Sequence, residues 1–203
     1  MADERAAILG RVKAALGQLP QRAALPEYDA ELAVVRKLLA QRDLFEVFAE
    51  RIQLVHGEAQ SDPEAVARRL REGGWMKGYC DPDLWPRLAP YFAGFKVETA
   101  FDRTRIDDYD FGITRAAGAI AESGTIVLND ATTSCRLGAL APWVHVAVIA
   151  LADLHPDLPH AVSKLGDDPN VIWCTGPSKT ADIEGILIEG VHGPGVQIAL
   201  VLD

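Results

Sequence analysis

The feature that most constrains the fold is a regular alternation of helix-like and strand-like segments after residue 56. Ser61-Asp62-Pro63 has the pattern of a capped helix start, and Gly73-Gly74 ends that helix. Strand-like sequence follows at residues 75–80 and 95–99, with a helix-like stretch between the two. Strands and helices that alternate at such intervals indicate βα units around a mostly parallel sheet.

The second half of the chain is denser in strand signals. Strands are expected at residues 125–129, 144–151, 170–174 and 197–202, and a short helix at residues 157–165. Residues 144–151 are apolar apart from His145, which is typical of a central strand covered on both faces. The uncharged stretch around them is shorter than the ~20 residues that a bilayer requires, so no membrane span is predicted.

The first part of the chain has helical periodicity, interrupted by a Pro-containing segment at residues 18–29. Its apolar stripes comprise Ile8, Val12 and Leu16, then Leu32, Val35 and Leu39, and finally Phe45, Phe48, Ile52 and Val55. Such stripes are more often core or subunit contact than part of a cofactor site. We therefore expect a helical extension over residues 1–58. One α/β domain, with a mostly parallel sheet and flanking helices, is expected over residues 59–203.

The charge balance argues against several classes of partner. The 203 residues include 20 Lys and Arg against 29 Asp and Glu, a formal net charge of −9. The sequence has no run of basic residues, so nucleic acid and anionic membranes are not expected as partners. The N-terminus lacks a basic region followed by an apolar one. No signal peptide is therefore predicted, and a cytoplasmic location is expected.

Cysteine usage argues against a cofactor held by this chain. Cys80, Cys135 and Cys174 are far apart in the sequence and odd in number, which is not the pattern of a disulfide framework. No C-x-x-C pair occurs, so a zinc site or an iron–sulfur cluster built by this chain alone is not expected. The G-x-G-x-x-G and G-x-S-x-G motifs are also missing. We predict no metal site and no cofactor in this chain.

The strongest candidate site is the segment G-P-S-K-T-A-D-I-E at residues 176–184, directly after an expected strand. Gly176 allows a sharp turn, and the hydroxyls of Ser178 and Thr180 could hold an anion at a helix start together with backbone N–H groups. Lys179 adds a positive charge. The spacing is not that of a Walker A loop. An equally weighted alternative is a helix cap by one of the hydroxyls, with the two following acidic residues favouring the helix dipole.

Two further segments carry polar residues beside glycines. In G-V-H-G-P-G, residues 190–195, His192 could hydrogen-bond to a ligand or act in acid–base chemistry, the alternative being a tight turn with a satisfied histidine. In A-E-S-G-T, residues 121–125, Glu122 has apolar and small neighbours, where desolvation would raise its pKa and suit a catalytic role. The alternative there is a buried turn in which Glu122 accepts backbone N–H groups. The other histidines are expected to be structural or solvated: His56, His145, His155 and His160.

These three segments, together with G-I-T at residues 112–114, resemble the LUD domain of the lactate utilization protein C family. The resemblance covers about residues 60–203, and the pairing of G-P-S-K-T-A-D-I-E with G-V-H-G-P is its specific part. It implies a fold similar to the NagB/RpiA/CoA-transferase group. It also implies a role beside iron–sulfur partner proteins in the oxidation of L-lactate to pyruvate.

Lactate oxidation removes two electrons and needs a redox cofactor, which the residues of this chain do not suggest. The resemblance therefore implies an accessory subunit that binds a small anionic metabolite, while electron transfer resides in the partner subunits. The alternative is an enzyme in its own right. CoA transferases of the similar fold use a glutamate nucleophile beside a glycine, and Glu122-Ser123-Gly124 resembles that setting.

One cleft is expected to collect the functional side chains, because parallel strands bring their loops together at their carboxyl ends. The expected catalytic residues are Glu122 and His192. The expected ligand-binding residues are Thr114, Thr125, Gly176, Ser178, Lys179, Thr180, Asp182, Glu184 and Gly193.

Overall fold

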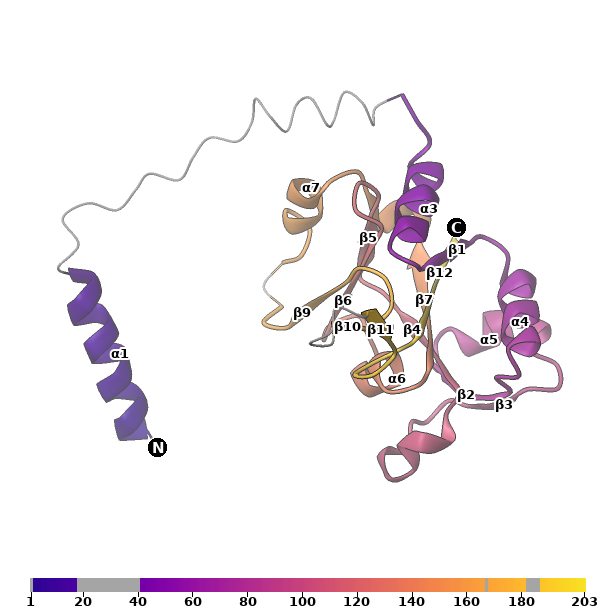
Figure 1. The fold of residues 1–203 in the computed structure, drawn as a ribbon, viewed down its shortest axis with the longest axis horizontal. Helices are drawn as coiled ribbons and strands as arrows, with labels where there is room; N and C mark the ends of the chain where they lie inside the picture. The colour runs from indigo at the N-terminus through magenta and orange to yellow at the C-terminus, as the bar shows by residue number, and fades with distance from the viewer. Residues whose placement is uncertain (1, 18–40, 167, 182–186) are drawn as a thin grey trace. The chain divides into compact units, whose positions relative to one another are not determined.

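The computed structural model describes residues 2–17, 41–166, 168–181 and 187–203 (Figure 1). The chain divides into two compact units, Met1–Val35 and Arg36–Asp203. In the first unit, α1 spans Ala2–Gly17 and confirms the helix expected there. The Pro-containing segment at residues 18–29 and the stripe of Leu32, Val35 and Leu39 lie outside the described residues.

A six-stranded, fully parallel sheet forms the centre of the second unit. Its strands, in spatial order, are β1 (Glu58–Gln60), β12 (Val196–Leu202), β7 (Val144–Ala150), β4 (Phe111–Arg115), β2 (Lys77–Cys80) and β3 (Lys96–Glu98). The apolar strand β7 lies in the interior of the sheet, as its sequence predicted. This arrangement confirms the α/β fold with a mostly parallel sheet and flanking helices.

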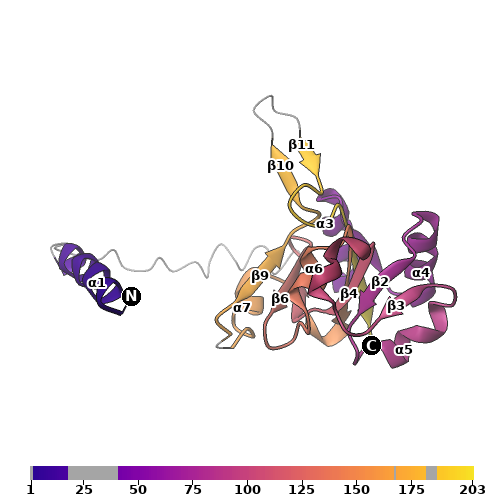
Figure 2. The same cartoon turned by 90° about the horizontal axis from the view of Figure 1, so that it is seen from below.

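Both faces of this sheet are covered, because successive side chains of a strand point to opposite sides. On one face, Val146 and Leu200 belong to a buried cluster with helices α4 (Pro63–Glu72) and α5 (Trp85–Leu88). On the other face, Ala147 and Ala199 pack with α3 (Leu44–Leu54) and with residues of a second sheet. Figure 2 shows α4 and α5 on one side of the unit and the second sheet on the other.

Helix α3 is part of the core of this unit. Val47, Phe48 and Ile52 are fully buried and share a cluster with the sheet residues Ala147 and Ala199. The apolar stripe of this helix is therefore a core contact. The sequence predicted a boundary between the helical extension and the α/β domain after residue 58. Helix α3 lies on the N-terminal side of that boundary.

The second sheet has four strands and mixed directions. In spatial order they are β8 (Leu154–His155), β5 (Gly118–Ile120), β6 (Thr125–Asn129) and β9 (Val171–Cys174). β6 pairs antiparallel with both β5 and β9, and β8 runs parallel to β5. The sequence predicted strands β6 and β9 but not their separation into another sheet. Gly124 has a φ of 66° in the tight turn between β5 and β6, a conformation that favours glycine.

The helix start expected after Gly176 is wrong. Lys179–Ala181 forms β10, which pairs antiparallel with β11 (Leu187–Glu189) in a separate two-stranded sheet. The N–H of Ser178 donates to the carbonyl of Pro194 (2.9 Å), and the N–H of Gly190 donates to the carbonyl of Ser178 (2.9 Å). The backbone groups of this segment thus bond across to the 190–195 segment instead of starting a helix. Figure 2 shows the hairpin projecting from the rest of the unit.

The remaining described elements are short. They are η1 (Ala89–Tyr91), η2 (Arg103–Asp108), α6 (Arg136–Leu140), η3 (Leu151–Asp153) and α7 (Leu158–Val162). The last of these confirms the short helix expected in residues 157–165, and Asp157 caps it by accepting the N–H of His160 (2.8 Å).

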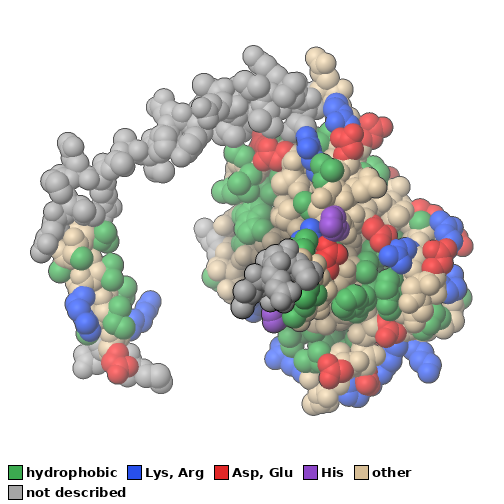
Figure 3. Space-filling model, in the orientation of Figure 1, with side chains coloured by type: hydrophobic (Ala, Val, Ile, Leu, Met, Phe, Trp, Pro, Cys, Tyr) green, Lys and Arg blue, Asp and Glu red, His purple; other side chains and the backbone are tan. Residues whose placement is uncertain are grey.

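The surface is mixed in charge on the face shown in Figure 3, where acidic and basic side chains are interspersed. Within the described ranges, no helix combines the length and apolar character needed to cross a bilayer.

Candidate functional site

A cavity of about 440 Å³ lies between the parallel sheet and the second sheet. Its lining comes from the start of β7 and β12, the end of β9, α6 and the two glycine-containing segments. Residues that line it include His145, Cys174, Gly176, Ser178, Lys179, His192, Gly193 and Gln197. The cavity therefore lies at the amino ends of the central parallel strands, although the sequence pointed to their carboxyl ends.

His145 and Gln197 form the polar floor of the cavity. They are paired residues of β7 and β12, so their side chains point to the same face of the sheet. Farther along the same face, the strands carry the apolar residues Ala147 and Ala199. Two residues along each strand thus separate the polar cavity floor from the packed core.

His145 reaches across the sheet to Thr114 of β4. Its Nε2 lies 3.0 Å from Thr114 Oγ1, and both residues are buried. Gly112, the β4 partner of His145, has no side chain in the way. A Cβ there would collide with the carbonyl oxygen of Gly138 in α6, so the close packing of α6 requires glycine.

Burial lowers the pKa of His145 to about 4, because desolvation penalises the imidazolium form. The ring is therefore neutral at neutral pH. Since Nε2 is engaged with Thr114 and no described residue bonds to Nδ1, the second ring nitrogen is available to a ligand as a donor or an acceptor.

Gln197 has the most unusual polar environment in the cavity. Only 3% of the residue is exposed, and its Oε1 is buried without a hydrogen-bond partner among the described residues. Its side chain is also within hydrogen-bonding reach of Cys174, where desolvation raises the pKa of the thiol and favours its neutral form. A buried acceptor without a donor is rare in native proteins, so the position suits an external donor.

The walls of the cavity come from the two segments that the sequence singled out. The Ser178–Pro194 and Gly190–Ser178 backbone bonds hold these segments side by side. No described residue bonds to Ser178 Oγ, and His192 is exposed at the cavity wall without a described partner. Both side chains are thus free to contact a ligand.

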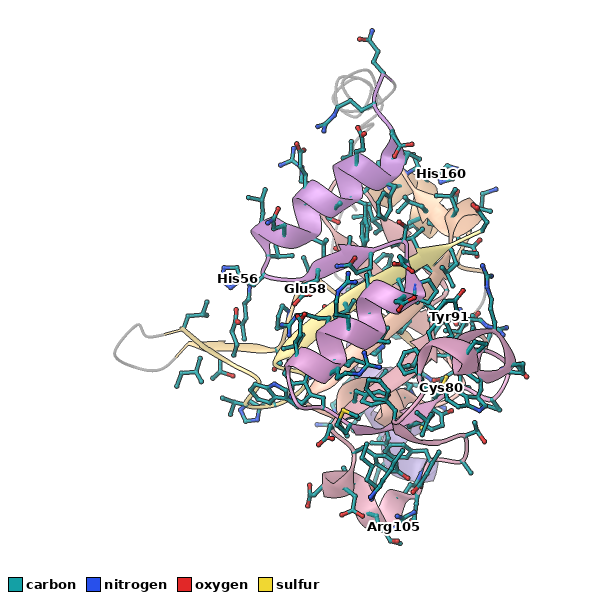
Figure 4. The ribbon with its side chains drawn as sticks, turned by 90° about the vertical axis from the view of Figure 1, so that its right-hand side faces the viewer. His56, Glu58, Cys80, Tyr91, Arg105 and His160 are labelled. Atoms are coloured by element: carbon teal, nitrogen blue, oxygen red, sulfur yellow. The ribbon has the colours of Figure 1, made fainter. Side chains whose placement is uncertain are left out.

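Lys179 lines the cavity but its ammonium group is already engaged. Nζ donates to the carbonyl of Val55 (2.8 Å) and lies 3.8 Å from Oε1 of Glu189. Glu189 also contacts His56, and Figure 4 shows His56 beside the hairpin. The lysine therefore ties the hairpin to the loop after α3 while its charge remains close to the cavity.

Other residues expected at the site lie at different places. Thr125 contacts Thr175, a lining residue, through a hydroxyl pair 2.8 Å apart. Thr180 is in β10, opposite Ile188. Asp182 and Glu184 lie outside the described residues.

Glu122 does not line this cavity. It is half-buried in the turn after β5, and its Oε1 accepts the N–H of Leu158 at the start of α7 (2.8 Å). This contact matches the alternative in which the carboxylate serves a backbone N–H. The structure therefore brings Ser178, Lys179 and His192 together but places Glu122 elsewhere.

The three cysteines belong to different elements. Cys80 is buried at the end of β2 and burial raises its pKa to about 12, whereas Cys135 accepts the N–H of Gly138 at the start of α6. Across the part of the chain that the structure describes, no three His, Cys, Asp or Glu side chains are grouped to hold a metal ion.

Sequence reasoning missed His145 and Gln197 as site residues. Each is a polar residue at the second position of an otherwise apolar strand, β7 and β12. That shared position is a weak signal, because only the pairing of the two strands shows that both side chains meet in one cavity.

Comparison with known proteins places this fold in a family. The profile of the LUD domain matches residues 31–202. A protein named lactate utilization protein C from Macrococcus caseolyticus is 35% identical over 185 residues, which cover 81% of this chain and 80% of that protein. Its namesake from Oceanobacillus iheyensis is 36% identical over 102 residues, 46% of this chain and 44% of that protein. The matched region thus spans less than half of the latter relative's length.

A solved structure has the same fold. A DUF162 family protein from Deinococcus radiodurans superposes with a TM-score of 0.59 at 23% identity, covering 81% of this chain and 98% of that chain. This likeness supports the architecture alone. The profile match spans most of the chain, and the Macrococcus caseolyticus protein is matched over most of its length. The chain therefore belongs to the LUD domain family.

Proposed function

We propose that this chain serves lactate utilization as an accessory subunit that binds a small anionic metabolite in the cavity between the two sheets. In this proposal, L-lactate is oxidised to pyruvate on iron–sulfur partner proteins, and this chain carries no redox cofactor. The relatives named lactate utilization protein C support the biological process. The polar groups of the cavity that lack a described hydrogen-bond partner support the binding of a ligand there.

The buried, unpartnered Oε1 of Gln197 carries the proposal. Leaving a buried acceptor without a donor costs about 1–3 kcal/mol, a cost that a ligand hydroxyl would remove. A small hydroxy acid has such a hydroxyl, and its carboxylate could contact Ser178 and His192 on the wall. The nearby charge of Lys179 favours an anion in this position. Lactate itself has this combination of groups.

Calorimetric titration of the full chain with lactate, pyruvate and acetate tests the binding step. We expect lactate to bind, and Gln197→Leu to weaken its affinity by about tenfold, the scale of one lost hydrogen bond in a desolvated site. Glu122→Gln is the control, because Glu122 does not line the cavity. Absence of binding by the unaltered chain, or equal affinity in Gln197→Leu, would contradict the proposal.

Spectroscopy and dye reduction test the accessory role. The purified chain should lack flavin and iron–sulfur absorption bands and should not reduce a dye with lactate. Adding the iron–sulfur partner proteins should restore lactate-dependent reduction, and cavity variants should lower its rate in the complete system. Lactate oxidation by the pure chain at an ordinary enzymatic rate would refute this role.

A further inference from the structure

A second cavity, of about 380 Å³, lies on the second, four-stranded sheet and shares no lining residue with the first. Its walls are residues of β6, β8 and α7 and of the segments that flank them. Thr132 and Asp153 also line a smaller cavity of about 160 Å³ beside it. That smaller cavity is lined by the last residues of β4, β7 and β12. The two adjoining cavities therefore lie at the carboxyl edge of the parallel sheet. Ligands of open α/β sheets commonly bind at this edge.

Three hydrogen-bond donors without a described hydrogen-bond partner line the cavity of about 380 Å³. Asn129 is buried, with 7% of the residue exposed. Its Oδ1 accepts the N–H of Thr132 (2.8 Å), and its Nδ2 has no partner among the described residues. The hydroxyl of Thr132 and the exposed ammonium group of Lys164 also line the cavity, and neither makes a hydrogen bond to a described residue. An amide, a hydroxyl and a positive charge therefore face the same space.

Two histidines add a further donor. The Nδ1 atoms of His155 and His160 lie 3.2 Å apart, so one ring donates to the other through these atoms. The accepting ring then carries its proton on Nε2, where it can donate to a ligand. His160 belongs to α7 and is labelled at the upper right of Figure 4. Burial, and then the neighbouring His160, lower the pKa of His155, which favours the neutral form of the His155 ring.

The charges around the cavity are few. Among the described residues, the cavity is lined by one cationic side chain, Lys164, and by one carboxylate, Asp153. Both residues are exposed. A ligand with both an anionic group and a hydroxyl would complement this pair, the anion facing Lys164 and the hydroxyl donating to Asp153.

We propose that this second cavity binds a small organic phosphate, with its phosphate group held by Lys164, Asn129, Thr132 and the histidine pair. A phosphate monoester offers three terminal oxygens, so it accepts bonds from donors on several walls. A carboxylate has two oxygens in one plane and would leave part of this donor set unused. Lysine acts here as a point charge, and the amide and hydroxyl fix the direction of the oxygens.

Nuclear magnetic resonance of the histidine rings in the full chain tests this site, with inorganic phosphate and glycerol 3-phosphate as probes at constant ionic strength. We expect both to shift the ring signals of His155 and His160 saturably. Lys164→Met should weaken the affinity by about tenfold, the scale of one lost charge-assisted hydrogen bond. Lys96→Met is the matched control, because exposed Lys96 lies on the edge strand β3 and lines neither cavity.

Three results would overturn the proposal. Phosphate could leave both rings unshifted, Lys164→Met could bind as tightly as the unaltered chain, or acetate could bind as tightly as glycerol 3-phosphate. Ser178→Ala, which alters the first cavity, should leave phosphate binding unchanged and so keeps the two sites distinguishable.

Discussion

Nδ1 of His56 lies 2.6 Å from Oε1 of Glu189, and this contact joins the loop after α3 to strand β11. Val55, the residue before His56, accepts a hydrogen bond from Lys179 of β10. Both strands of the hairpin are therefore attached to one short loop. Since Ser178 precedes β10 directly, these contacts position a wall of the candidate cavity.

Glu189→Gln should loosen the hairpin, because it removes the charge that faces both His56 and Lys179. Amides of β10 and β11 should exchange faster with solvent. The free energy of unfolding should change by less than about 1 kcal/mol, since the contacts are at the surface. Hydrogen exchange measured by mass spectrometry checks this, with exposed Glu72→Gln as control. Unchanged exchange in the hairpin would show that these contacts do not hold it.

His56 also has an unfavourable backbone conformation, with a φ of 69°. Glycine adopts this left-handed conformation without the steric cost that a Cβ brings. His56→Gly and His56→Ala both remove the contact with Glu189, so their difference isolates the backbone. We expect His56→Gly to be the more stable by about 1 kcal/mol in urea unfolding. Equal stability of the two variants would argue against the left-handed backbone.

His145 should make stability depend on pH. Its pKa is lowered from 6.5 to about 4 in the folded chain, so the unfolded chain binds the proton more readily between these values. The contribution is fully present above pH 6.5 and is lost as the pH falls from 6.5 towards 4, about 3 kcal/mol in all. Urea unfolding across this range should show a flatter profile for His145→Gln than for the unaltered chain. Exposed His192→Gln is the control and should retain the steep profile.

Lys179→Met should weaken lactate binding by about 1–3 kcal/mol through loss of a nearby charge. It should also speed hydrogen exchange in the hairpin, because the bond to Val55 is lost. Lys179→Arg should restore most of the affinity, since it keeps the charge. Calorimetry of the three proteins separates these effects. If the Met variant bound lactate normally, the charge would have no part in binding.

Glu122→Ala should destabilise the chain by about 1 kcal/mol, because the N–H of Leu158 loses its acceptor at the start of α7. Lactate affinity should stay unchanged. Incubation with acyl-CoA should give no adduct on Glu122 of the unaltered chain, as judged by mass spectrometry. A covalent adduct there would favour the CoA-transferase alternative.

Local sequence determined much of this fold. The caps of α4, the apolar run of β7 and the alternation of helices and strands each act through neighbours in the chain, so they could be predicted from it. The segments containing Ser178 and His192 could also be singled out, since glycines and polar residues mark where a chain turns.

The tertiary structure alone decided where these pieces meet. Residues 179–181 became a strand because partners in residues 187–189 satisfy their backbone, a pairing that local propensity does not encode. Glu122 lies away from the site, and its carboxylate accepts the N–H of Leu158 at the start of α7. His145 and Gln197 are separated by 51 intervening residues in the printed sequence and face one cavity only because β7 and β12 pair in one register. Strand pairing and the stacking of two sheets are long-range choices, set by the total burial that the chain achieves.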